Sequence, residues 1–67
     1  MRRVAAHEVR CPDGSTVHPG IVEIADGTVR KIGQFVEELE RTEWLGGTIE
    51  IRQEGESLRA YKNNKPI

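Results

Sequence analysis

The chain has 67 residues, of which 36% are hydrophobic and 31% charged, with a formal net charge of −1. That length holds one domain, and we expect residues 1–67 to form it. No run approaches the roughly 20 apolar residues that span a bilayer, and the first residues reach Glu8 too early for a secretory signal. Cys11 is the single cysteine, which excludes an internal disulfide framework. We therefore expect a cytoplasmic protein without a membrane segment.

The small size of the chain bears on its stability. A domain of about 60 residues buries only about 60% of the surface of its unfolded chain. Neither a disulfide nor a metal motif compensates, and small cores of this kind often depend on association. We therefore predict a homodimer or another protein partner.

The amino-acid usage favours strands. Six Val, six Ile and four Thr stand against three Leu and four Ala. Turn signals separate the short apolar runs at Pro12-Asp13-Gly14, Pro19-Gly20, Asp26-Gly27, Gly46-Gly47, Glu54-Gly55 and Asn63-Asn64. This pattern predicts an all-β fold, a small antiparallel meander of hairpins folded on itself like a half-barrel. We expect at most one short helical turn, near residues 35–41, where Phe35 and Leu39 are four residues apart.

The strongest hairpin signal is Asp26-Gly27, which suits a two-residue turn with positive φ at both positions. The predicted register pairs Ala25 with Thr28, Ile24 with Val29, Glu23 with Arg30, and Ile21 with Ile32. The apolar pair Ile24–Val29 and the oppositely charged pair Glu23–Arg30 then fall on opposite faces of the sheet.

A second hairpin is predicted to close at Glu54-Gly55. It pairs Ile51 with Leu58, Glu50 with Arg59, and Ile49 with Ala60. A third, very short hairpin closes at Asn63-Asn64, because Asn tolerates left-handed backbone geometry. The N-terminal run, residues 3–10, offers Val4, Ala6 and Val9 for an inner face.

These registers predict the core. We expect the apolar residues of the two hairpins to share one interior: Val22, Ile24, Val29, Ile49, Ile51 and Leu58. Phe35, Leu39 and Trp44 are predicted to close its open end. An exposed Trp44 would instead mark a contact surface.

The order of features also carries a family likeness. A Cys11-Pro12-Asp13-Gly14 loop and an apolar strand from Gly20 are followed by the Asp26-Gly27 turn and a strand that ends in Ile32-Gly33. Glu37-Glu38-Leu39 and Trp44-Leu45-Gly46-Gly47 follow. Over residues 3–47 this series resembles the beginning of amidohydrolase-superfamily enzymes. The resemblance implies the small composite β-domain that flanks the catalytic barrel of those enzymes.

The resemblance ends where the catalytic chemistry of the family would begin. Thr48-Ile49-Glu50-Ile51 follows Gly46-Gly47, and no histidine occurs after His18. No catalytic or metal-binding residue of the family has a counterpart, and 67 residues are too few for a barrel of about 250. We therefore predict a non-catalytic structural or protein-interaction module with no cofactor.

The alternative is a small ligand- or metal-binding protein, or an enzyme, that uses His7, Cys11 and His18. Their spacing matches no zinc motif, and a fourth ligand is missing. Cys11 with His18 as its base would need an orienting group and an oxyanion site, and the sequence signals neither. The default interpretation is surface histidines beside a turn and a small, partly buried cysteine.

Nucleic-acid binding is the remaining class. It would use a face that carries Arg30, Arg52 and Arg59. Eleven acidic residues balance ten basic ones, and few aromatic residues are present to stack on bases. The composition therefore argues against a nucleic-acid partner.

For Gly46-Gly47, the absence of a following Lys-Ser/Thr indicates a bend and not a phosphate loop.

Overall fold

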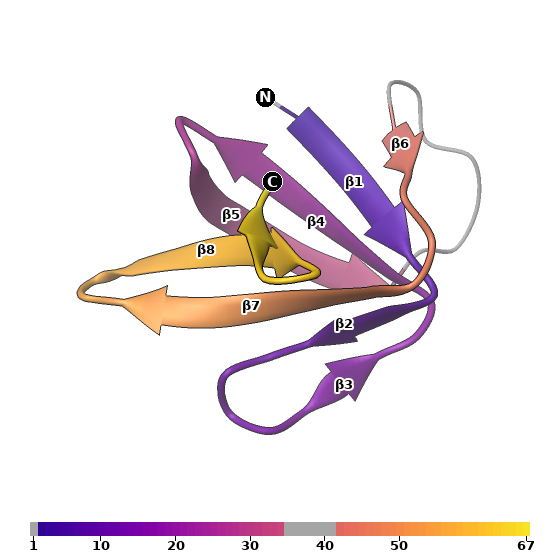
Figure 1. Ribbon diagram of the computed structural model, residues 1–67, viewed down its shortest axis with the longest axis horizontal. Helices are drawn as coiled ribbons and strands as arrows, with labels where there is room; N and C mark the ends of the chain where they lie inside the picture. Colours follow the sequence, from indigo (N-terminus) through magenta and orange to yellow (C-terminus); the bar gives the residue numbers. More distant parts are fainter. Residues whose placement is uncertain (1, 35–41) are drawn as a thin grey trace.

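Three extended segments of the chain, residues 2–10, 16–25 and 42–54, lie side by side (Figure 1). Each segment bends at the same level and contributes one strand to each of two sheets. The computed structural model describes residues 2–34 and 42–67, all in strands, turns and loops. The strands are β1 (Arg2–Ala6), β2 (Glu8–Arg10), β3 (Thr16–Val17), β4 (Gly20–Ala25), β5 (Thr28–Gln34), β6 (Thr42–Trp44), β7 (Thr48–Glu54), β8 (Ser57–Lys62) and β9 (Lys65–Pro66). Within these described residues there is no helix, and so none that could cross a membrane.

The order of the strands corrects part of the predicted topology. Sheet A has the order β5-β4-β1-β6, and sheet B has the order β3-β2-β7-β8-β9. β1 pairs with β6, and β2 with β7, in parallel. The all-β prediction is confirmed, but a purely antiparallel meander is wrong. The N-terminal segment is central in both sheets, and the segment from Thr42 returns alongside it in the same direction.

The predicted register of the Asp26-Gly27 hairpin is confirmed next to the turn and is wrong farther from it. Asp26 has φ 53° and Gly27 has φ 73°, as the predicted turn requires. Next to the turn the register is as predicted, with Ala25 opposite Thr28 and Ile24 opposite Val29. A bulge then shifts the register by one residue, and the pairs beyond it are Glu23–Lys31, Val22–Ile32 and Ile21–Gly33. The bulge moves Ile32 to the core side of the sheet, and it leaves Glu23 beside Arg3 and not opposite Arg30.

The second hairpin has a register shifted by two residues from the prediction. Ile51 pairs with Ala60 and Glu50 with Tyr61. Glu54 and Ser57 close the hairpin, so Gly55 is the first turn residue, at φ 63°, and not the second. A shift by two keeps every side chain on its face, so Ile51 is still buried.

Two smaller turns agree with the sequence patterns. Asn63 and Asn64, at φ 54° and 64°, join β8 to β9. The Asp13-Gly14 loop brings Val9 opposite Val17 and Arg10 opposite Thr16.

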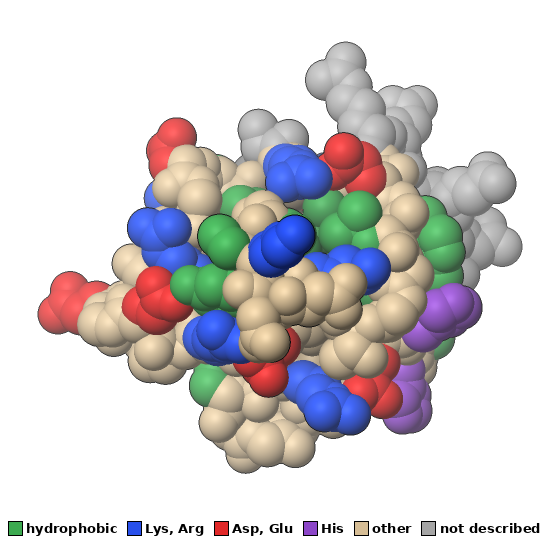
Figure 2. Space-filling view, viewed as in Figure 1, with side chains coloured by type: hydrophobic (Ala, Val, Ile, Leu, Met, Phe, Trp, Pro, Cys, Tyr) green, Lys and Arg blue, Asp and Glu red, His purple; other side chains and the backbone are tan. Residues whose placement is uncertain are grey.

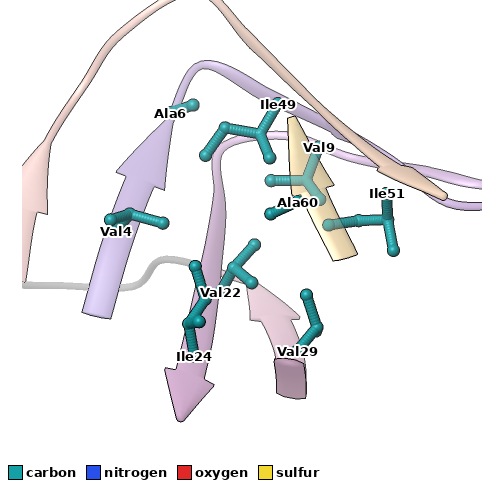
Figure 3. Packing of buried hydrophobic residues seen from close by; sticks show 9 residues of the cluster. All are labelled: Val4, Ala6, Val9, Val22, Ile24, Val29, Ile49, Ile51 and Ala60. Carbon is teal, nitrogen blue, oxygen red and sulfur yellow. The ribbon is translucent and has the colours of Figure 1, made fainter. Parts of the chain in front are cut away.

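The core lies between the two sheets (Figure 3). Its buried side chains are Val4, Ala6, Val9, Val22, Ile24, Val29, Ile49, Ile51 and Ala60. Val17, Ile32, Leu45, Leu58 and Ile67 pack against them and are only partly buried. The predicted core residues are therefore all present, with Leu58 at the margin. β5, an edge strand of sheet A, lies alongside β8 of sheet B and closes one side of the core.

The bend between the sheets depends on close backbone packing. Gly46 and Gly47 have φ 69° and 62°, which confirms the predicted bend between β6 and β7. A Cβ at Gly20 would lie 2.4 Å from Cγ2 of Val9, so the backbone of β4 approaches that side chain directly.

One predicted closure of the core is wrong. Trp44 is 50% exposed and lies outside the core cluster. Phe35 and Leu39, and the helical turn predicted near residues 35–41, lie outside the residues that the structure describes.

Candidate functional site

The structure brings two of the three predicted site residues to the bend. The pairs Ala6–Gly20 and Val9–Val17 enclose His7 on one segment and His18 on the other. Both histidines are exposed, and Figure 2 shows them on the same side of the molecule. His7 and His18 are thus neighbours in the strand order, although their sequence spacing gave no such indication.

Cys11 lies apart from them, at the outer end of β2. Its N–H donates to the carbonyl oxygen of Ser15 at 2.8 Å, which places it at the base of the Asp13-Gly14 loop. Cys11 is four positions from His7 along an extended segment, which corresponds to roughly 13 Å. Within residues 2–34 and 42–67, no three His, Cys, Asp or Glu side chains are grouped so as to hold a metal ion.

The Asp13 loop is held by hydrogen bonds between Asp13 and Ser15. The Asp13 carboxylate accepts from the hydroxyl of Ser15 at 2.6 Å and from the backbone N–H of Ser15 at 2.9 Å. These two bonds, the hydroxyl bond most, hold the pKa of Asp13 below its ordinary value. The loop is exposed, so the lowered pKa of Asp13 reflects its contacts with Ser15 and not a charged site around it.

The most distinctive surface group at the bend is Trp44. It is the one large hydrophobic side chain found exposed in the described part of the chain. Its ring contacts the ring of His7 edge to face, with centroids 4.9 Å apart and an interplanar angle of 89°. Gly46 lies beside both rings, and a Cβ there would be 3.7 Å from Nε1 of Trp44.

Trp44 belongs to an apolar row that crosses sheet A on the face opposite the core. Cross-strand pairing aligns Gly33 with Ile21, Ile21 with Ala5, and Ala5 with Trp44. Ala5 and Ile21 lie outside the core cluster and are nevertheless buried, so Trp44 is the exposed side chain of this row. We call the two exposed side chains at the end of this row, Trp44 and the adjoining His7, the Trp44 surface.

No local pattern in the sequence indicates this row. The register predicted from the Asp26-Gly27 turn places Ile21 opposite Ile32 and does not involve Ala5. The row exists because β1 pairs with β6 in parallel, and this pairing joins residues about 40 positions apart. Only long-range pairing information could have predicted it.

The strand edges are protected against pairing with another strand. β3 and β9 have two residues each, β9 contains Lys65 and Pro66, and β6 has three residues. β5 is long, but it carries the bulge and the exposed Arg30 and Lys31. Short strands, bulges, prolines and charges are the usual devices that prevent edge-to-edge association.

The three arginines considered for nucleic-acid binding do not form an open basic face. Arg52 contacts Glu50 at 2.5 Å, and Arg59 lies 3.6 Å from Glu54. Arg30 is exposed on β5, in the other sheet. Figure 2 shows acidic side chains interspersed among Lys and Arg on the face that it displays.

Comparison with known proteins adds no family to this description. The chain matches no protein-family model, no curated protein and no solved structure. The resemblance of residues 3–47 to the amidohydrolases therefore stays a prediction from the sequence.

Proposed function

We propose that this chain is a non-catalytic β-domain that acts as a protein-interaction module through the Trp44 surface. The exposure of Trp44 carries the proposal. Half of a large aromatic side chain faces solvent while nine smaller side chains fill the core. Tryptophan is enriched among the residues that supply most of the binding energy at protein interfaces.

The proposed contact uses side chains and not strand addition. Each edge of the two sheets is short, bulged or charged, which disfavours pairing with a foreign strand. The Trp44 surface, by contrast, presents an exposed aromatic ring that packs edge to face on the exposed His7. Its partner therefore needs an apolar patch that accepts the ring.

A second copy of the chain is the partner that we propose. A stable interface buries about 800 Å² on each partner. The surface of the molecule is 4588 Å², so such a contact would cover about one sixth of it. For a domain with so small a core, that burial would be a substantial gain in stability.

The resemblance to amidohydrolases is compatible with this proposal. We propose that the two bent sheets correspond to the half-barrel-like composite β-domain of that family, present without its barrel. In the described residues no charged or polar residue is buried in the core, and no chemically reactive group lines its interior. A structural or interaction role is the function that this arrangement supports best.

The test uses Trp44 as its own reporter, because it is the single tryptophan of the chain. Sedimentation equilibrium from 1 µM to 1 mM should show a concentration-dependent dimer. The fluorescence maximum of Trp44 should move to shorter wavelength over the same range, because the ring leaves water. Trp44→Ser should abolish the dimer and change the free energy of unfolding of the monomer by less than about 1 kcal/mol, as surface substitutions do.

Tyr61→Ser is the matched control, since it removes an aromatic ring from sheet B and should leave the dimer intact. A monomer at every concentration would exclude the second copy as partner. If Trp44→Ser instead lowered the free energy of unfolding by more than about 2 kcal/mol, Trp44 would be a folding residue. The interaction proposal would then be wrong.

A further inference from the structure

A small polar pocket lies on sheet B, on the face turned away from the core. It has a volume of about 180 Å³ and is lined by Thr48, Glu50, Tyr61, Asn63 and Asn64. Glu50 and Tyr61 are cross-strand partners, and the Asn63-Asn64 turn follows directly after β8.

Arg52 organises one side of this pocket. Its Nε donates to Glu50 at 2.5 Å, and its Nη2 donates to Oδ1 of Asn64 at 2.8 Å. The guanidinium also stacks on the ring of Tyr61, 4.2 Å from the ring centroid. Three of the lining residues, Glu50, Tyr61 and Asn64, thereby contact a single cation.

Tyr61 is held at its far end as well. Its hydroxyl donates to the carboxylate of Glu54, and this bond is the main reason that the pKa of Tyr61 is raised. The phenol therefore stays neutral at physiological pH. Its ring is an apolar wall beside otherwise polar groups.

The remaining hydrogen-bonding groups around the pocket are available to a ligand. The Thr48 hydroxyl and the Asn63 amide have no hydrogen bond to any group in residues 2–34 or 42–67. Asn64 uses only its oxygen, so its NH₂ group retains two donors. Glu50 keeps one carboxylate oxygen as an acceptor.

We propose that this pocket binds a single neutral pyranose sugar. The free groups offer donors and acceptors together, which matches hydroxyl groups because each hydroxyl both donates and accepts. Arg52 neutralises Glu50, so the pocket has no net charge to select an ion. Arg52 covers one face of the Tyr61 ring, and the rest of the ring that lines the pocket gives the C–H groups of a sugar an apolar surface to pack against.

The test titrates the ¹⁵N-labelled chain with glucose, galactose, mannose and N-acetylglucosamine, each to 100 mM. At least one sugar should produce saturable shifts of the Asn63 and Asn64 side-chain amides, with a Kd on the order of 1–10 mM, as few exposed hydrogen bonds allow. Asn64→Ala and Thr48→Val should each weaken that affinity at least tenfold. Sodium sulfate and open-chain sorbitol serve as charged and acyclic probes.

Gln53→Ala is the matched control, because it removes an exposed amide from the opposite face of the same strand. This variant should bind the sugar as the parent chain does. Dispersed amide spectra of all variants would show that they are folded. The proposal is wrong if no sugar gives saturable shifts, if sulfate or sorbitol binds as well as the best sugar, or if Asn64→Ala and Gln53→Ala behave alike.

Discussion

Gly20 and Val9 pack in direct contact at the bend between the two sheets. A Cβ on Gly20 would lie 2.4 Å from Cγ2 and 2.9 Å from Cβ of Val9. Val9 is completely buried, so it has no space into which to move. The bend that brings His7, His18 and Trp44 to one end of the molecule therefore depends on a glycine at this position.

Gly20→Ala should consequently destabilise the fold. The added methyl group overpacks the core, which typically costs about 1–3 kcal/mol. Gly33→Ala is the control, because its Cβ would lie 4.0 Å from Ile21, an ordinary contact distance. That substitution should be neutral or raise the free energy of unfolding by up to about 1 kcal/mol. Urea unfolding followed by circular dichroism compares the two, and equal effects would contradict the packing argument.

Truncation of the core should be severe for a domain of this size. Ile51 is 2% exposed and faces the core from β7. Ile51→Ala should cost about 2–5 kcal/mol, a large part of the stability of a small domain. Glu50→Ala changes the neighbouring residue on the exposed face, where its partner is Arg52. It should cost less than about 1 kcal/mol. If Ile51→Ala unfolded at the same temperature as the parent chain, the placement of Ile51 on the core face of β7 would be wrong.

Local patterning predicted the faces of the strands better than their partners. Ile24, Val29, Ile49 and Ile51 are buried as expected, because alternation fixes which side of a strand is apolar. The same rule failed for Ile32, because the bulge at Arg30 reverses the alternation. A bulge adds one residue without a distinctive sequence signature. The second hairpin tolerated a wrong register, since a shift of two residues preserves the faces.

The candidate site was less predictable than the core. The neighbouring sequence does not distinguish Trp44 from a buried apolar residue. Its exposure follows from the parallel pairing of β6 with β1. The polar pocket likewise depends on Arg52 bridging to Asn64, twelve positions away. Neither relationship is contained in a short window of sequence.

Thr42 offers a stabilising substitution. Its Oγ1 is buried and has no hydrogen-bond partner in the structure as described. An unpaired buried hydroxyl costs about 1–3 kcal/mol, and valine keeps its branched shape. Thr42→Val should therefore raise the free energy of unfolding by about 1 kcal/mol. Thr48→Val, at an exposed position, should leave it unchanged. Differential scanning calorimetry of both variants provides the comparison.

The Asp13 loop should make a small, local contribution to the dependence of stability on pH. Its hydrogen bonds to Ser15 lower the pKa of the folded carboxyl, so the unfolded chain binds a proton more readily in acid. The stabilisation is present above the unfolded pKa, about 3.9, and is lost as the pH falls through the lower folded value. Ser15→Ala removes the stronger of the two bonds, and the folded pKa should rise toward the ordinary value. NMR titration of the Asp13 carboxyl carbon in both proteins measures this, and identical titration curves would show that Ser15 does not stabilise the carboxylate.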